Sequence, residues 1–499
     1  MKTLAYLLEE CGVTMPVPPL PVAGLSLDTR TLEKGAVFFA LKGRSGDGHQ
    51  YLQTAIARGA CALVVEDRQY SLKSWPVPCI WVPNLADKLA QIADKFYDFP
   101  LEGIVFSGFT GTNGKSTSAY VTAQVYTQIG IPCGFIGTFG VGMGPWETWD
   151  KQLHASSGLT TPDIFSLRAY IKQLKAQGAQ HICMEVSSHA LDQNRIQGIP
   201  FTNAVFTNLT RDHLDYHETL EEYAAAKAKL FALPSLQHAI LNAEDACTPA
   251  FAAKVSGHAK VWHYGIDLKQ APDFQQVDAT IESYGTQGVH FALKGEYEAL
   301  KIHCPLLGAF NVRNCLAAFT HGLANGLDPQ ILTHALAQVH PAPGRMQALG
   351  MPGTPMVVVD YAHTPDALLK ALEALRSHTQ GQLWCVFGCG GDRDRGKRPL
   401  MGEVAAQYAD RIVLTNDNPR KEPPMHIIKE IWEGIGPQKM VDVYLDRAQA
   451  ITFALQHASP EDVVLIAGKG HETVQDLGHV KLPHNDVACV LSFLETVKS

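Results

Sequence analysis

The sequence predicts an α/β protein of three domains, each built on a mostly parallel sheet. The chain has 499 residues, which at about 150 residues per domain suggests about three domains. Hydrophobic residues make up 46% of the chain, so each domain can bury a core. Short apolar runs alternate with stretches of helical spacing, as is typical of parallel sheets covered on both faces by helices.

The first block of the chain extends to about residue 97. The apolar run Ala36–Leu41 predicts a strand, the glycine-rich loop 42–48 follows it, and Cys61–Val65 predicts a second strand. Further along the chain, Pro341–Gly344 has the composition of a rigid linker. The expected domains are therefore residues 1–97, 98–342 and 343–499.

The most informative stretch opens the second block. Gly103–Ser107 predicts a buried strand, and Ala119–Ile129 predicts a helix. Between them lies a glycine-rich loop, composed of Gly111, Thr112, Asn113, Gly114, Lys115, Ser116 and Thr117. Such a turn directs backbone N–H groups and the positive end of the helix dipole at an anion.

This loop predicts a nucleotide site in which Lys115 reaches the terminal phosphates and Ser116 or Thr117 contacts Mg²⁺. The spacing departs from that of the standard phosphate loop, because Phe109 stands where the first glycine should be. A tight turn with a surface lysine is the alternative.

Polar side chains also follow two other apolar runs of this block. Glu185 ends the run that begins at Ile182, and Asn208, Asp212 and His213 follow the run that begins at Ala204. A carboxylate and an imidazole at neighbouring strand tips can both reach a metal near the phosphates. Glu185 could instead be a capping or ion-pairing carboxylate, and His213 an ordinary loop histidine.

Lys227 lies in a predicted helix, where helical spacing places it on one face with Leu220, Tyr223, Leu230 and Phe231. A lysine on an apolar stripe must extend its ammonium to solvent, find a partner, or lose its proton. A neutral amine can add carbon dioxide, and the resulting anionic carbamate could ligate Mg²⁺. Spacing alone favours the first of these outcomes.

The third block begins with a predicted strand at Met356–Asp360. Three more strands are predicted, at Trp384–Phe387, Arg411–Leu414 and Asp462–Ile466. After the third of these strands comes Asp417–Arg420, which is either a proline turn or a recognition loop. A guanidinium such as that of Arg420 recognises a carboxylate through two parallel hydrogen bonds.

Composition argues against several classes of partner. The net charge is −8 and interspersed, whereas a nucleic-acid-binding protein would need a basic face. No apolar run approaches the roughly 20 residues that span a bilayer, and acidic residues follow the N-terminus too soon for a secretory signal. The eleven cysteines show no zinc spacing and suit reduced thiols. We expect a cytoplasmic protein without membrane insertion.

The motifs together resemble the Mur ligases of peptidoglycan synthesis, a pathway on which cell shape and cell division depend. The resemblance covers all three blocks and rests on four segments: Gly111–Thr117, Glu185–His189, Asn208 with Asp212 and His213, and Gly308–Asn314. It implies a UDP-substrate-binding domain, a central phosphate-loop ATPase domain and a C-terminal Rossmann-like domain. It also implies ATP binding by Asn311 and Arg345, and a magnesium site of Ser116, Glu185, His213 and carbamylated Lys227.

The resemblance further assigns the two remaining substrates. The UDP-muramoyl-dipeptide would contact Leu27, Thr29, Arg44, Ser45, Gly46, Thr160, Thr161, Ser187, Gln193 and Arg195. The assignment of Arg44, Ser45 and Gly46 leaves a purely structural loop as the alternative. The amino-acid substrate would contact Arg393, Asp417, Asn418, Pro419, Arg420, Gly468 and Glu472.

The tetrapeptide Asp417–Arg420 is similar to that of the members that add diaminopimelate, because members that add lysine lack the arginine. The expected reaction is ATP-dependent addition of meso-2,6-diaminopimelate to the D-glutamate side-chain carboxylate of UDP-N-acetylmuramoyl-L-alanyl-D-glutamate, through an acyl phosphate. Lys115, Lys227, His213 and Glu185 are the expected catalytic residues, and a monomer is expected. The alternatives are a lysine-adding ligase, a folylpolyglutamate synthetase-like ligase, and a nucleotide-controlled binding protein that makes no amide.

Overall fold

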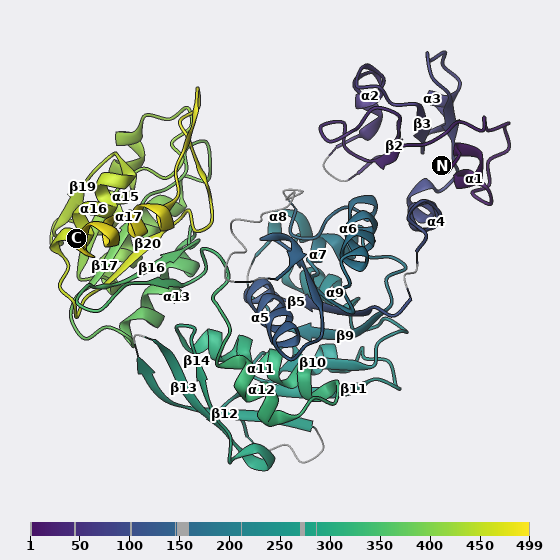
Figure 1. Cartoon of the computed structure of the whole chain (residues 1–499). Helices are drawn as coiled ribbons and strands as arrows, with labels where there is room; N and C mark the ends of the chain where they lie inside the picture. Colours follow the sequence, from purple (N-terminus) through teal and green to yellow (C-terminus); the bar gives the residue numbers. More distant parts are fainter. Residues whose placement is uncertain are drawn as a thin grey trace.

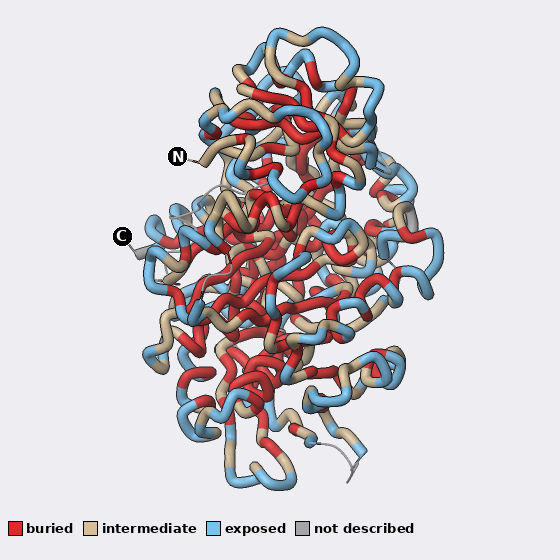
Figure 2. Tube along the Cα trace, turned by 90° about the vertical axis from the view of Figure 1, so that its right-hand side faces the viewer, coloured by how far each residue is buried: buried red, intermediate tan, exposed pale blue. Residues whose placement is uncertain are grey.

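The computed structural model describes residues 2–43, 46–99, 102–144, 146, 159–210, 212–269, 275–285 and 287–498. These residues form three lobes arranged along the chain, with the N-terminal lobe joined to the central one through α4 and the C-terminal lobe beyond α11 (Figure 1). Buried residues concentrate along the sheets of each lobe, and the loops carry most of the exposed ones (Figure 2).

The N-terminal lobe contains a four-stranded parallel sheet in the order β1-β2-β3-β4. β2 and β3 are buried along their whole length, because apolar residues occupy both faces of each strand. The elements are α1 Leu4–Leu8, β1 Gly24–Ser26, β2 Ala36–Ala40, η1 Gly48–Tyr51, α2 Leu52–Ala57, β3 Ala62–Val65, α3 Arg68–Ser71, β4 Cys79–Trp81 and α4 Leu85–Tyr97.

The central lobe contains a ten-stranded sheet in the order β14-β13-β12-β11-β10-β9-β5-β8-β6-β7. Its middle strands are parallel, and antiparallel strands extend it at both edges. The strands are β5 Val105–Thr110, β6 Cys133–Gly137, β7 Gly140–Met143, β8 His181–Glu185, β9 Phe201–Phe206, β10 His238–Asn242, β11 Lys260–Ile266, β12 Gln275–Gly285, β13 Gly288–Leu293 and β14 Lys301–Cys304. The helices are α5 Lys115–Gln128, α6 Ile164–Ala176, α7 Ser188–Asp192, α8 Leu214–His217, α9 Leu220–Ala228, α10 Thr248–Ala252, α11 Ala309–Ala324 and α12 Pro329–Leu336, with η3 at Gly295–Tyr297.

The C-terminal lobe contains a six-stranded sheet in the order β15-β16-β20-β17-β18-β19, parallel except for β15. A separate hairpin, β21 with β22, follows the sheet. The strands are β15 Gln347–Leu349, β16 Met356–Asp360, β17 Leu383–Phe387, β18 Arg411–Leu414, β19 Val441–Val443, β20 Val463–Ala467, β21 Val474–Asp476 and β22 Lys481–Pro483. The helices are α13 Pro365–Arg376, α14 Lys397–Tyr408, α15 Pro424–Ile435, α16 Arg447–His457 and α17 Asp486–Lys498.

The predicted strands of all three blocks are confirmed, with shifts of one to three residues at some ends. Two predictions are wrong in detail. α5 begins at Lys115 rather than Ala119, because Gly114 takes a positive φ of 83° and allows the helix to start directly after the loop. Leu220 is 40% exposed and does not share the buried face of Lys227, because the first turn of α9 faces solvent.

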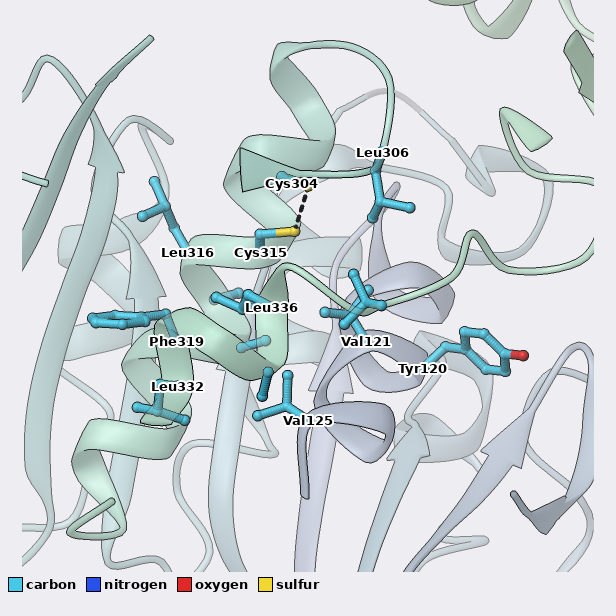
Figure 3. Packing of buried hydrophobic residues seen from close by; sticks show 14 of the residues in the cluster. Tyr120, Val121, Val125, Cys304, Leu306, Cys315, Leu316, Phe319, Leu332 and Leu336 are labelled. Carbon is cyan, nitrogen blue, oxygen red and sulfur yellow. Dashed lines mark hydrogen bonds between the residues drawn. The ribbon is translucent and has the colours of Figure 1, made fainter. Parts of the chain in front are cut away.

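α5 is the helix that carries the phosphate loop, and it is buried on most sides. It packs on the sheet and against α11 and α12, and its Val121 and Val125 belong to one buried cluster with Leu316, Phe319 and Leu336 (Figure 3). In the same cluster the Sγ atoms of Cys304 and Cys315 lie 3.1 Å apart as free thiols. The packing holds the two helix N-termini, at Lys115 and Ala309, on one side of the lobe.

The central lobe contacts both of its neighbours. α4 packs on α6, where the buried guanidinium of Arg168 donates to Asp94 at 3.0 Å. On the other side, Leu307 packs into the core of the C-terminal lobe, and the Gly308 N–H donates to Nε2 of His378 at 3.0 Å. Within the described part of the chain, no helix has the length and apolar character required to cross a bilayer.

Candidate active site

The predicted phosphate loop contains two glycines whose backbone conformations are rarely adopted by residues that carry a side chain. At Gly111 φ is 149°, and a Cβ would lie 2.0 Å from Oγ1 of Thr207. At Gly114 φ is 83°, and a Cβ would lie 2.6 Å from Oδ1 of Asn314. The tight approach of the neighbouring strand tip and of α11 therefore requires glycine at both positions.

Asn208, at the tip of β9, fixes the loop through three hydrogen bonds. Its carbonyl accepts from the Thr112 N–H at 2.7 Å, its Oδ1 from the Asn113 N–H at 3.0 Å, and its Nδ2 donates to the Asn113 carbonyl at 2.9 Å. Nζ of Lys115 donates to the Thr112 carbonyl at 2.7 Å. The loop and its lysine are therefore preorganised for a phosphate.

Glu185 ends β8 and is fully buried beside this loop. One carboxylate oxygen accepts from the Ser116 hydroxyl at 2.7 Å, and the other accepts from the Thr138 N–H at 2.7 Å. Burial raises the pKa of Glu185, and the nearby charges of Lys115 and Arg345 oppose that shift. The structure thus brings together Lys115, Ser116 and Glu185 as predicted.

Lys227 is buried, with only 1% of its surface exposed, so its side chain does not extend to solvent. Its Nζ donates to the Gly111 carbonyl at 2.7 Å and lies 4.3 Å from the centre of the Tyr223 ring. Burial lowers the pKa of Lys227 well below its usual value, and the charge of Lys115 lowers it further. Burial of this kind favours the neutral amine over the ammonium.

His213 lies at the rim of the same region. Its ring centre is 5.9 Å from that of Tyr223 and 4.9 Å from that of His189, and its side chain is 45% exposed. The residue has a positive φ of 53° at the start of α8. Tyr223 therefore neighbours both His213 and Lys227.

The donors at the site suit magnesium better than a softer metal. Glu185 and Ser116 supply oxygen ligands, and Mg²⁺ prefers one or two carboxylates together with phosphates and water. Among the described residues no group of three or more His, Cys, Asp and Glu gathers around one point. Lys227 could add an oxygen ligand only as a carbamate.

The N-terminus of α11 faces the start of α5. Asn311 is 4% exposed, and its Nδ2 donates to the Leu307 carbonyl at 2.8 Å. Nδ2 of Asn314 donates to Asn311, and its Oδ1 accepts from the Ser118 hydroxyl at 3.0 Å. These bonds connect the predicted adenine-side residue to the phosphate-loop helix.

Arg345 connects the central and C-terminal lobes. Its guanidinium carbon lies 5.0 Å from the Tyr361 ring centre and 5.9 Å from that of Phe139, which belongs to the central lobe. Phe139 also meets the ring of His471, at 5.8 Å between centres. Nε of Arg345 and Nδ1 of His471 are buried with no hydrogen-bond partner among the described residues. A buried, unpaired guanidinium N–H such as Nε of Arg345 suits an anionic ligand.

The predicted dipeptide residues of the central lobe form one network beside Glu185. The Thr161 hydroxyl donates to the Glu185 carbonyl at 2.9 Å and accepts from the Ser187 N–H at 3.0 Å. Arg195 donates to the Thr161 carbonyl at 2.9 Å and to Oε1 of Gln193 at 2.6 Å. Thr160 meets the Thr138 hydroxyl at 3.4 Å, so it adjoins the same network.

The predicted uridine-side residues lie in the N-terminal lobe, away from this network (Figure 1). Thr29 is buried and follows β1, Leu27 packs on the lobe's core, and Gly46 is exposed at the loop after β2. Arg44 and Ser45 lie outside the described residues.

The predicted amino-acid pocket gathers at the tips of β17, β18 and β20. Nη1 of Arg420 donates to the Gly391 carbonyl at 2.7 Å, and Nδ2 of Asn418 donates to Glu472 at 2.9 Å. A Cβ on Gly468 would lie 2.7 Å from Asp417. The Pro419 carbonyl accepts from the Glu422 N–H, and Arg393 is exposed on the adjacent loop.

Tyr361 lies beside Arg345 and beside His471, next to the amino-acid pocket. Burial raises the pKa of Tyr361, and the charges that act on it include Glu472 and Asp417 as well as Arg345. The sequence prediction did not include Tyr361, although it directly follows a predicted strand. Thr138 and Lys469 were missed in the same way: each follows a strand tip, where ligands gather in parallel sheets.

The chain is similar to known proteins over most of its length. Residues 21–97 match the Mur ligase family catalytic domain, residues 109–322 the Mur ligase middle domain, and residues 344–470 the Mur ligase glutamate ligase domain. The UDP-N-acetylmuramoyl-L-alanyl-D-glutamate–2,6-diaminopimelate ligase of Alkalilimnicola ehrlichii is 44% identical over 483 residues, covering 95% of each chain. The ligase of that name from Coxiella burnetii is 42% identical over 97% of this chain and 98% of its own.

A solved structure of a ligase with the same name superposes with a TM-score of 0.70 at 33% identity, and the match covers all of both chains.

Proposed function

The chain belongs to the Mur ligase family, and on that premise we propose that it joins meso-2,6-diaminopimelate to the D-glutamate side-chain carboxylate of UDP-N-acetylmuramoyl-L-alanyl-D-glutamate, with ATP as co-substrate. The observation that carries the proposal is the position of Arg345. Its guanidinium carbon lies 5.9 Å from the Phe139 ring centre in the central lobe and 5.0 Å from the Tyr361 ring centre in the C-terminal lobe. Phosphoryl transfer and amine attack would therefore share one junction.

In the first step the side-chain carboxylate of the dipeptide attacks the γ-phosphorus of ATP, ADP leaves, and an acyl phosphate forms. Such a transfer depends mainly on positioning and charge neutralisation. The loop amides and Lys115 would bind the phosphates, and Nε of Arg345, which is buried without a hydrogen-bond partner among the described residues, would donate to the transferring group. Thr160, Thr161, Ser187, Gln193 and Arg195 would orient the dipeptide.

In the second step the amine of diaminopimelate attacks the acyl carbonyl, phosphate leaves, and the ammonium proton is lost to solvent or phosphate. The protein needs no nucleophile for this chemistry. It must bring the amine to the carbonyl and exclude water from the acyl phosphate, which the aromatic contacts of Phe139, Tyr361 and His471 at the junction would favour.

Ser116 and Glu185 would hold Mg²⁺, which when bound neutralises charge on the phosphates. Carbamylation of Lys227 is part of the proposal: its buried, easily deprotonated amine suits reaction with carbon dioxide. The carbamate would place an anion beside Lys115 and supply an oxygen ligand. His213 would act from the rim, beside Tyr223.

The amino-acid pocket favours diaminopimelate over lysine. Arg420 would bind the distal carboxylate, Glu472 the distal ammonium, and Asp417, Asn418, Gly468 and Arg393 would complete the pocket. A lysine substrate lacks the distal carboxylate and would leave Arg420 unpaired, which costs a few kcal/mol when a buried charge is involved. The uridine end would contact Leu27, Thr29 and the loop at Gly46, and we propose domain bounds of 1–97, 98–342 and 343–499.

The test is incubation of the pure protein with ATP, Mg²⁺, the muramoyl dipeptide and either diaminopimelate or lysine, with product masses as the readout. The proposal predicts the tripeptide mass with diaminopimelate and little product with lysine. ATP turnover without any amide product would contradict it, as would a clear preference for lysine.

A further inference from the structure

The amino-acid pocket contains a buried lysine to which no role has been assigned so far. The side chain of Lys469 is fully covered, although it lies in a glycine-flanked loop directly after β20. Its Nζ donates to Oε2 of Glu472 at 2.7 Å and to Oδ1 of Asn418 at 3.0 Å. Buried ammonium groups are costly unless they are paired, so this placement requires an explanation.

Lys469 is the centre of a network that fixes two substrate-facing side chains. Oε2 of Glu472 accepts from both Lys469 and Asn418, and Oδ1 of Asn418 accepts from Lys469 and from the Asp476 N–H at 2.8 Å. With Oε2 held in this way, Glu472 can present Oε1 to a substrate ammonium. The network thus ties the loop after β18 to the loop after β20.

The strand tips that carry these loops are anchored separately. Arg447 and Asp486 form a fully buried ion pair at 2.7 Å, and Arg447 donates to the Ala467 carbonyl at 2.9 Å, at the end of β20. Lys469 is therefore not needed to hold the backbone of β20 in place. Its contacts concern the pocket itself.

Lys469 also affects the balance of charge in the pocket. Its ammonium offsets Glu472, and the guanidinium of Arg420 has Asp476 at 4.0 Å. The two side chains proposed to bind the distal end of the substrate therefore each have an opposite charge beside them in the protein. Such a pocket suits a distal group that is itself neutral overall, such as the ammonium and carboxylate of diaminopimelate. A lysine substrate would bring an uncompensated positive charge.

We propose that Lys469 is a specificity-determining and positioning residue: it orients Glu472 and Asn418 and, by neutralising Glu472, disfavours amino acids whose side chain carries only a cation. This inference rests on the proposed function. Removing the ammonium would leave the carboxylate of Glu472 without its counter-charge, which a lysine substrate could supply.

Three substitutions separate orientation from charge. Lys469→Met removes both the donors and the charge, Lys469→Gln keeps two donors without the charge, and Lys469→Arg keeps both. The readout is the ratio of kcat/KM for diaminopimelate to kcat/KM for lysine, with KM for ATP and the melting temperature measured on each variant. Lys370→Met is the control, because Lys370 pairs with Asp366 on the exposed face of α13.

We expect the ratio to fall about tenfold in Lys469→Met and Lys469→Gln, since tenfold corresponds to about 1.4 kcal/mol of lost discrimination. It should stay near the wild-type value in Lys469→Arg and Lys370→Met, with KM for ATP unchanged throughout. An equal loss for both amino acids, with the ratio unchanged, would overturn the inference and indicate a purely structural lysine. Should Lys469→Met fail to fold, the Gln and Arg variants alone decide the matter.

The wild-type protein separates this result from the proposed function. If wild type forms no product with diaminopimelate, the proposed function is wrong. If wild type forms it and the ratio is the same in the Gln and Arg variants, only the role of Lys469 is wrong.

Discussion

The surroundings of Lys115 suit its proposed role in binding phosphate. Its Nζ is held against the Thr112 carbonyl, and desolvation lowers its pKa while Glu185 and Asp212 oppose that shift. An incoming phosphate would supply the negative charge that this position lacks. We predict that Lys115→Ala lowers kcat by about 10²–10³-fold, the usual cost of removing a donor that stabilises transition-state charge.

Steady-state kinetics would check this prediction, with KM for diaminopimelate as the internal control because the amino-acid pocket is not altered. Normal ligation by Lys115→Ala would show that the loop does not bind the reacting phosphates.

Lys227 supports a prediction that distinguishes chemistry from packing. If its amine is carbamylated, Lys227→Ala should lose about a hundredfold or more in activity, and short carboxylic acids such as acetate should partly restore it by replacing the missing carboxylate. Activity measured against acetate concentration provides the readout. The control is Lys229→Ala, because Lys229 is half-exposed and pairs with Asp192. A lack of rescue in a folded Lys227→Ala protein would indicate that this lysine only supports the Gly111 carbonyl.

At the scale of elements, the linker after α12 is held against the loop after β20. Gly344 has a φ of 61°, and a Cβ there would lie 2.1 Å from the His471 nitrogen and 2.3 Å from the Gly470 carbonyl carbon. Gly344→Ala should therefore move the neighbouring Arg345 away from the phosphate side. We expect kcat to fall at least tenfold, because small misplacements of positioning groups are costly.

A matched control for backbone strain is Gly353→Ala. Gly353 also has a positive φ, of 87°, but a Cβ there meets nothing within 4 Å. Gly353→Ala should lose only the stability that a positive φ costs, whereas Gly344→Ala should lose more stability in thermal denaturation and should also lose turnover. Equal activity in the two variants would show that the linker contact does not position Arg345.

A buried polar cluster joins β5, β8 and α11 beneath the phosphate loop. The Ser107 hydroxyl lies 2.7 Å from Nε2 of His181 and 2.7 Å from Nε2 of His321. Burial lowers the pKa of His181 to about 3 and that of His321 well below its usual value. Both imidazoles are therefore neutral in the folded protein over most of the accessible pH range.

This cluster predicts loss of stability in mild acid. In the unfolded chain histidine takes up a proton near pH 6.5, whereas folded His181 does so only near pH 3, so the unfolded state binds more protons between these values. The free energy of unfolding should fall with decreasing pH across this window, by up to about 1.4 kcal/mol per pH unit for each histidine. Urea denaturation of His181→Gln should show a shallower slope, while exposed His258→Gln should match wild type. An unchanged slope in His181→Gln would contradict the prediction.

The sequence predicted those elements whose pattern is local. Buried parallel strands such as β16 and β18 were located to the residue, because short apolar runs bounded by polar loops define them. The antiparallel strands β12, β13 and β14 were not predicted, since their mixed polar and apolar residues resemble exposed loops and their pairing is set by tertiary contacts. The start of α5 was missed because it depends on the conformation of Gly114.

The candidate site could be predicted only in part for a related reason. Motifs indicated Lys115, Glu185 and Arg420, but nothing local to the sequence showed that Arg345 would stack on Tyr361 and Phe139 from two lobes. Likewise the pairing of Lys469 with Glu472 and Asn418 joins two loops about 50 positions apart in the sequence. Contacts of this kind arise from packing and not from a pattern along the chain.

At the scale of the whole molecule, the three lobes hold separate parts of one proposed reaction. The central lobe supplies the phosphate loop, the C-terminal lobe the amino-acid pocket, and the N-terminal lobe the proposed uridine contacts (Figure 1). Phe139, Arg345 and His471 already join the central and C-terminal lobes. The central claim is that the dipeptide carboxylate is phosphorylated at this junction before the amine attacks.

Transfer of an oxygen label tests this claim most directly. The D-glutamate side-chain carboxylate of the dipeptide is labelled with ¹⁸O, the protein is supplied with ATP, Mg²⁺ and diaminopimelate, and the released phosphate is analysed by mass spectrometry. An acyl phosphate requires that one labelled oxygen leave with phosphate for every tripeptide formed. Unlabelled phosphate would mean that water, and not the dipeptide, had attacked ATP, and the ligase account would be wrong.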